Sequence, residues 1–119
     1  MRVLVTGAAG QLGQDVVRTW SSAGDDVVGV DRSQLDVTDR DDVFGAVVHG
    51  GFDVVVNCAA FTAVDRCETE SDAAFAVNAV AVRWLAEATR RSGAHLVHVS
   101  TDYVFDGALD RPYVEWDEP

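Results

Sequence analysis

The stretch VTGAAGQLG, residues 5–13, decides the fold. It follows the apolar run Arg2–Thr6 and precedes a segment whose apolar side chains recur at helical spacing. The spacing GxxGxxG places Gly7 at a tight turn, Gly10 where backbone can approach a pyrophosphate, and Gly13 where a helix packs closely on a strand. The free N–H groups and positive dipole end of that helix favour phosphate. The stretch therefore predicts a dinucleotide-binding loop.

Strand-like and helix-like segments alternate along the rest of the chain. Further strands are predicted at residues 26–31, 52–57 and 94–100, helices at 11–23, 39–49 and 71–91 with Thr38 and Ser71 as caps, and loops at 62–70 and 106–119. Apolar strands separated by helices indicate a parallel sheet covered on both faces. Right-handed crossovers then predict a doubly wound α/β sheet of the Rossmann type, with strand order 3-2-1-4.

Length and charge narrow the class of protein. The chain has 119 residues and 48% hydrophobic content, which suits one globular domain, and its net charge of −11 argues against nucleic-acid or anionic-membrane binding. No apolar run approaches the ~18 residues of a membrane span, and the N-terminus lacks a signal-peptide pattern, so we expect a cytoplasmic protein. His95 and His98 point to opposite faces of a predicted strand, and no metal site is predicted.

The end of the second predicted strand carries an acid, Asp31, about twenty residues after Gly10. A carboxylate there accepts hydrogen bonds from the adenosine ribose of NAD and repels the 2′-phosphate of NADP, but Arg32 follows at once and could pair with that phosphate. NAD(H) is favoured only slightly over NADP(H). Asp36 and Val37 could lie beside the adenine, although Asp36 could equally be an acid at a helix entry.

Two loops leave the carboxyl ends of strands, where ligands bind in such folds. Small residues at Ala59 and Ala60, followed by Phe61 and Thr62, leave room for a cofactor after the third strand. STDYVFDG, residues 100–107, follows the fourth strand and offers hydroxyls beside the same crevice, although these could also just satisfy a strand end. A reductase tyrosine of this kind needs a lysine four residues on, and all nine basic residues here are arginines.

These residues together resemble the extended short-chain dehydrogenase/reductases and, within them, the dTDP-4-dehydrorhamnose reductase family. The matching pieces span essentially the whole chain: VTGAAGQLG (5–13), DVTD (36–39), DVVVNCAAFTAVDRCE (53–68), Ala76-Val77-Asn78, VHVSTDYVFDG (97–107) and RPYVEWDEP (111–119). The pair VNCAAFTAVD and STDYVFDG is specific, whereas the glycine spacing alone would indicate only nucleotide binding. The resemblance implies NAD(P)H-dependent reduction of the C4 ketone of dTDP-4-dehydro-L-rhamnose, a dTDP-sugar substrate, to dTDP-L-rhamnose.

The resemblance also implies roles for individual residues. Thr101 would hydrogen-bond the ketone oxygen as the catalytic residue, and Thr101, Asp102 and Tyr103 would bind the sugar. Asn78 resembles a helix asparagine that supports the proton-relay region. The resemblance implies cofactor contacts at Gly10, Gln11, Leu12, Asp31, Asp36, Val37, Ala59, Ala60 and Phe61. With Gly7, Gly13, Arg32 and Thr62, taken from the residue patterns above, the predicted cofactor-binding set has thirteen members.

One departure from the family pattern bears on activity. The YxxxK segment, whose tyrosine gives the proton and whose lysine lowers that tyrosine's pKa, does not occur in the chain. We expect residues 1–119 to be the dinucleotide-binding domain of a longer enzyme, cut before YxxxK and the substrate domain and inactive alone. Magnesium in the intact enzyme is left open.

Two other functions fit the same residues. One is a non-catalytic, dinucleotide-binding regulatory module of this fold, and the other is part of a sugar-nucleotide epimerase or dehydratase. If later strands are missing, an uncovered sheet edge would favour a homodimer or self-association.

Overall fold

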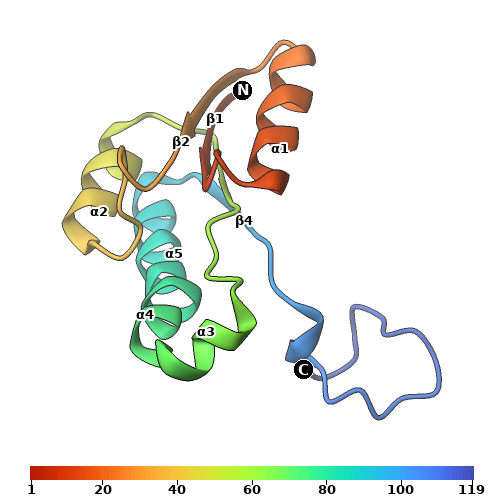
Figure 1. Ribbon diagram of the computed structural model, residues 1–119. Coiled ribbons are helices and arrows are strands. Elements are labelled where there is room, and N and C mark those ends of the chain that lie inside the picture. The colour runs from red at the N-terminus through yellow and green to blue at the C-terminus, as the bar shows by residue number, and fades with distance from the viewer.

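The computed structural model of the protein describes residues 1–119. Four parallel strands form one sheet: β1 (Arg2–Thr6), β2 (Asp26–Val30), β3 (Val54–Asn57) and β4 (His95–His98). Helix α1 (Gln11–Ser22) covers one face, while α2 (Arg40–His49) and α5 (Ala81–Ser92) lie together on the other (Figure 1). The predicted doubly wound parallel α/β fold is confirmed.

The observed strand order is β2-β1-β3-β4, so the predicted order 3-2-1-4 is wrong. β3 lies beside β1, on the side away from β2. The reason is that α2 packs with α5 on the face opposite α1. A right-handed connection from β2 through that face must run back across β1. All four residues of β3 are buried, as suits a strand with neighbours on both sides.

The core divides into two layers because successive strand side chains point to opposite faces. Val3 and Val5 pack on the α1 side with Val54 and Val56. Leu4 packs on the other side in a cluster that also contains Val55, Leu35, Val43, Val47, Leu85 and Ala88. β1 and β3 both supply side chains to the two layers and are the interior strands of the sheet, so the core holds the loop that follows β1 in place.

Three details of the helices differ from the sequence predictions. Asp39, rather than Thr38, caps α2 by accepting hydrogen bonds from the backbone N–H groups of Asp41 and Asp42. The predicted helix 71–91 is divided into α4 (Ser71–Phe75), the π-helical segment η1 (Ala76–Val80) and α5.

The third difference is a short helix, α3 (Val64–Thr69), inside the predicted loop 62–70. Although this segment is polar, it contains an ion pair at the i, i+4 spacing of a helix. Arg66 donates two hydrogen bonds of 2.9 Å to the carboxylate of Glu70. Cys67 donates its backbone N–H to the carbonyl of Ala63, which closes a helical turn.

β4 is an edge strand, and Val97 within it and Val99 just after it are exposed. After a 3₁₀ turn, η2 (Asp102–Val104), the chain forms a loop that extends away from the sheet and its helices (Figure 1). Within this loop, stacked rings of Phe105 and Tyr113 and a paired Arg111 and Asp117 hold the chain together. None of the helices combines the length and the apolar composition that a membrane-spanning segment requires.

Candidate functional site

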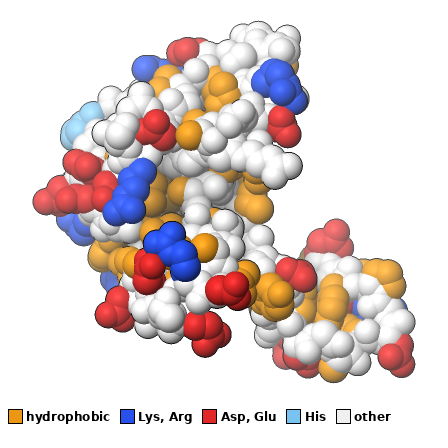
Figure 2. Space-filling view, viewed as in Figure 1, with side chains coloured by type: hydrophobic (Ala, Val, Ile, Leu, Met, Phe, Trp, Pro, Cys, Tyr) orange, Lys and Arg blue, Asp and Glu red, His pale blue; other side chains and the backbone are white.

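Two adjoining clefts lie at the carboxyl ends of the strands. The larger, about 860 Å³, is lined by the glycine loop, the segment after β3 and the segment after β4, and the smaller, about 280 Å³, extends from it to the end of β2. They share Gly10 and the run Cys58–Phe61. The space-filling view shows a hollow between the part of the molecule with α1 and the part with α3 (Figure 2).

The structure brings the predicted cofactor residues together. Eight line the larger cleft: Gly10, Gln11, Leu12, Gly13, Ala59, Ala60, Phe61 and Thr62. The remaining five line the smaller one: Gly7, Asp31, Arg32, Asp36 and Val37. A single elongated ligand crossing both clefts would contact the whole set.

The glycine loop approaches its neighbours as closely as backbone allows. Gly7 has φ +67°, and a Cβ there would lie 2.6 Å from the backbone nitrogen of Ala59. A Cβ on Gly13 would lie 2.2 Å from the carbonyl oxygen of Gly7. Gly10 stands at the N-cap of α1 and gives no side-chain cap, so the first N–H groups of this helix stay open to an anion in the cleft.

Two carboxylates in the smaller cleft are held by the turn that follows β2. The hydroxyl and backbone N–H of Ser33 donate to Asp31 Oδ1 at 2.6 and 2.8 Å and lower the pKa of Asp31. Thr38 holds Asp36 Oδ1 in the same way and lowers the pKa of Asp36. Both acids are ionised at neutral pH, and each keeps its second oxygen for a ligand.

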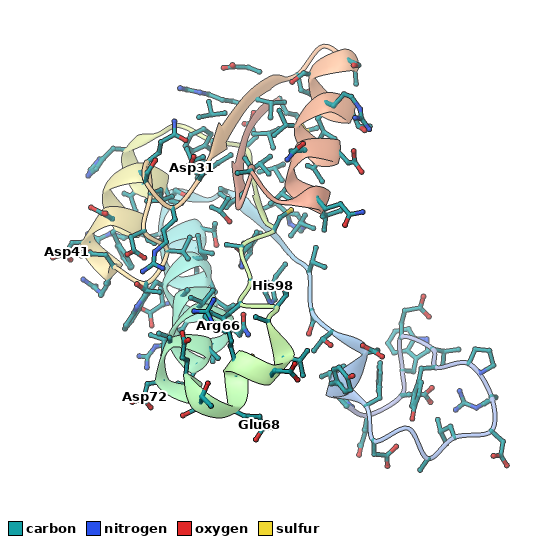
Figure 3. All side chains as sticks on the ribbon, viewed as in Figure 1. Asp31, Asp41, Arg66, Glu68, Asp72 and His98 are labelled. Carbon is teal, nitrogen blue, oxygen red and sulfur yellow. The ribbon has the colours of Figure 1, made fainter.

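Arg32 is the cation of the smaller cleft. Its side chain is 85% exposed, and its nearest acid atom, Asp36 Oδ2, is 3.9 Å away, which is too far for a hydrogen bond. The guanidinium thus retains its donors. Figure 3 places Asp31 at the end of β2, whereas Asp41, Glu68 and Asp72 lie on the periphery.

The segment after β3 is fixed by a clamp from η1. Asn78 accepts a hydrogen bond of 2.8 Å from Phe61 N–H and donates one of 3.0 Å to Phe61 O. Arg66 stacks over the Phe61 ring at 5.4 Å from its centroid. π-Helical turns often accompany functional sites, and this one carries the residue that sets the shared wall of both clefts. The implied role of Asn78 in proton relay stays a prediction.

Asn78→Ala should weaken binding of the predicted dinucleotide by roughly three- to tenfold, because a loop that loses two hydrogen bonds must be ordered by the ligand. The free energy of unfolding should change by less than about 1 kcal/mol, since the side chain is exposed. Calorimetric titration and urea unfolding measure the two effects, with Ala79→Ser in the same segment as control. Unchanged affinity in Asn78→Ala would show that the loop keeps its conformation without the clamp.

The predicted substrate residues are only partly brought together. Thr101 and Tyr103 line the larger cleft, but Asp102 does not. Thr101 donates to Asp102 Oδ1 at 3.2 Å and accepts from Tyr103 N–H at 3.3 Å, so its hydroxyl also caps η2. Tyr103 is 81% exposed and does not belong to the core.

Sequence reasoning missed several cleft residues, among them Cys58, Cys67 and His98. Burial raises the pKa of the Cys58 thiol, which keeps it in its neutral form. The sequence feature that points to His98 as a cleft residue is its position at the end of an edge strand, three residues before Thr101. No group of three or more histidine, cysteine or acidic side chains is arranged to hold a metal ion.

A parallel sheet wound on both faces, with a glycine turn into a helix and acids after the second strand, defines an α/β domain of the Rossmann type. The family model described as "RmlD substrate binding domain" matches residues 1–119, and the chain belongs to this family.

Relatives agree with this assignment. The chain is 46% identical to a dTDP-4-dehydrorhamnose reductase of Mycobacterium tuberculosis over 98% of its length and 39% of that protein. It is 48% identical to a probable dTDP-4,6-dihydroxy-2-methyloxan-3-one 4-ketoreductase of Streptomyces antibioticus, over 97% of this chain and 39% of that protein.

A solved structure, dTDP-4-dehydrorhamnose reductase from Bacillus anthracis in complex with NADP, superposes with a TM-score of 0.92 and 38% identity, covering 99% of this chain and 42% of that one. The chain thus spans about two-fifths of the proteins it resembles.

Proposed function

We propose that this chain binds a nicotinamide dinucleotide and, within a longer protein, serves the reduction of the C4 ketone of dTDP-4-dehydro-L-rhamnose. The observation that carries the proposal is the arrangement of the two clefts: the thirteen residues predicted to bind the cofactor line them, and Thr101 lines the larger one. One relative is named dTDP-4-dehydrorhamnose reductase and another is named as the 4-ketoreductase of a different dTDP-sugar, so the names support reduction of a C4 ketone on a dTDP-sugar.

The bound cofactor would supply hydride, and the chain's residues would position both reactants. The open N-terminus of α1 holds the pyrophosphate, and the smaller cleft holds the adenosine end. Thr101 would turn its hydroxyl proton from Asp102 Oδ1 to the ketone oxygen, on which negative charge develops. No tyrosine of the chain has a lysine four residues on, so the proton donor would come from the remainder of the protein.

The test is oxidation of NADPH and NADH followed at 340 nm with dTDP-4-dehydro-L-rhamnose. The full-length protein should turn over, and residues 1–119 alone should bind the dinucleotide without turnover. Binding without turnover by the full-length protein would favour the non-catalytic module instead. Absence of dinucleotide binding in both would contradict the proposal.

Arg32 is proposed to admit NADP(H) beside NAD(H). Its donors are available, whereas the ionised Asp31 opposes a 2′-phosphate. Arg32→Ala should weaken NADP⁺ binding by about tenfold through loss of a charge-assisted contact and leave NAD⁺ binding unchanged. Titration of both dinucleotides against Arg32→Ala and the control Arg90→Ala measures this. An equal loss for both dinucleotides would contradict the role.

The unpaired edge of β4 is proposed as a surface for self-association of the 119-residue chain. Sedimentation velocity at increasing concentration tests this, and a monomer that persists throughout would count against it.

A further inference from the structure

Three polar side chains form a line across the sheet at the carboxyl ends of its strands. Thr6 of β1 is in register with Asn57 of β3, which is in register with His98 of β4. Thr6 Oγ1 lies 2.6 Å from Asn57 Oδ1, and Asn57 Nδ2 lies 3.0 Å from His98 Nδ1. Thr6 and Asn57 are 1% and 2% exposed, so their partners cannot be replaced freely by water.

A backbone group decides which way the Asn57 amide points. The N–H of Ala59 lies 3.2 Å from Asn57 Oδ1, and a backbone N–H can only donate. The atom facing Ala59 must therefore be the amide oxygen. Asn57 Nδ2 then faces His98, and the Thr6 hydroxyl donates its proton to the same amide oxygen.

The amide in turn decides the tautomer of His98. Asn57 Nδ2 is a hydrogen-bond donor only, so His98 Nδ1 must be the acceptor. In the neutral imidazole the single proton then resides on Nε2. A proton on Nδ1 would place two N–H donors face to face at 3.0 Å. The sheet therefore presents His98 as a donor through Nε2 and not as an acceptor.

His98 is an exposed side chain that lines the larger cleft and not the smaller one. In the same cleft are Ser100 and Thr101, while the acids of the adenosine end line the smaller cleft. Figure 3 shows His98 at the end of β4, beside the segment that leads from β3 to α3. A donor in this position faces the half of an elongated ligand that is remote from its adenine.

We propose that His98, fixed as the Nε2–H tautomer by Asn57, donates a hydrogen bond to an oxygen acceptor on the nicotinamide riboside half of the bound dinucleotide. The ligand identity rests on the proposed function, whereas the tautomer rests on the hydrogen bonds alone. His98 is thus a positioning donor for the half of the cofactor that must lie beside Thr101.

The tautomer is tested without any ligand. The chain contains three histidines, and long-range ¹H–¹⁵N spectra of the ¹⁵N-labelled 119-residue protein at pH 8 distinguish a protonated from an unprotonated ring nitrogen for each. His98→Gln identifies its signals. We expect an unprotonated Nδ1 and a protonated Nε2 for His98. A protonated Nδ1, or fast averaging between the tautomers, would overturn the proposal.

The contact is tested with two substitutions that separate the ring nitrogens. The amide of asparagine reaches the position of Nδ1, and that of glutamine reaches the position of Nε2. His98→Asn should therefore weaken NADP⁺ binding by about three- to tenfold, the effect of one lost hydrogen bond, and His98→Gln should bind within about twofold of the unchanged protein. His95→Asn, on the same strand but outside the clefts, is the control.

A shortened ligand shows which half of the dinucleotide is contacted. 2′-Phospho-ADP lacks the nicotinamide riboside, and its affinity should be equal in the unchanged protein and in His98→Asn. An equal loss of affinity for NADP⁺ and 2′-phospho-ADP in His98→Asn would show that His98 does not contact the nicotinamide riboside half. No loss of affinity for either ligand would show that His98 makes no contact with the dinucleotide. Both results overturn this proposal and leave the proposed function intact. Failure of the unchanged protein to bind NADP⁺ would overturn both.

Discussion

We expect Gly13→Ala to lower the free energy of unfolding by about 3 kcal/mol and to abolish measurable dinucleotide binding. The added methyl would lie 2.2 Å from Gly7 O and 2.8 Å from Ala8 Cα, both backbone atoms. No side-chain rotation relieves such a contact. Helix α1 must shift away from β1, and the N-terminal N–H groups of the helix then leave their place in the cleft.

Gly45→Ala is the matched control, because it also adds one methyl to a helical glycine. Gly45 is exposed on α2 with nothing within 4 Å of the added Cβ, so this change should stabilise by up to about 1 kcal/mol. Urea unfolding and NADP⁺ titration of both variants measure the difference. A Gly13→Ala protein as stable as the unchanged one, with NADP⁺ binding intact, would show that the close approach of α1 to β1 is dispensable.

The sequence predicted best those features that depend on neighbours along the chain. The glycine turn, the acid after β2 and the small residues after β3 each follow from local backbone and side-chain requirements. The structure places all thirteen residues predicted to bind the cofactor around the two clefts. The helix α3 was missed because its polar composition resembles a loop, although the pair Arg66 and Glu70 already had helical spacing.

Features that depend on pairing between distant strands were not predictable in this way. The predicted strand order was wrong because packing against α5, about forty residues later in the chain, determines which face of the sheet α2 covers. No local sequence pattern indicates that packing. The line from Thr6 through Asn57 to His98 depends on that same order, since it exists only if β3 lies between β1 and β4. Once the order is known, the line follows from the register.

The second large effect is expected at Thr101. In the full-length protein, Thr101→Val should lower kcat for the proposed reduction by about 100- to 1,000-fold, the usual effect of removing one donor to a developing oxyanion. Binding of NADPH should change by less than about twofold, because no predicted cofactor contact is lost. Steady-state rates with dTDP-4-dehydro-L-rhamnose and a separate NADPH titration distinguish the two quantities.

A structural role for the same hydroxyl must be separated from the catalytic one, because Thr101 Oγ1 also accepts from Tyr103 N–H at the start of η2. Thr101→Ser keeps both the cap and the donor and should retain most of the turnover. Ser100→Ala removes a neighbouring hydroxyl in the same cleft and tests whether any hydroxyl suffices. If Thr101→Val turned over normally, the ketone would have to be polarised by another group. If Ser100→Ala lost as much as Thr101→Val, the oxyanion donor could not be assigned to Thr101 alone. A large loss confined to Thr101→Val, with NADPH binding intact, would leave direct contact with the reacting oxygen as the explanation.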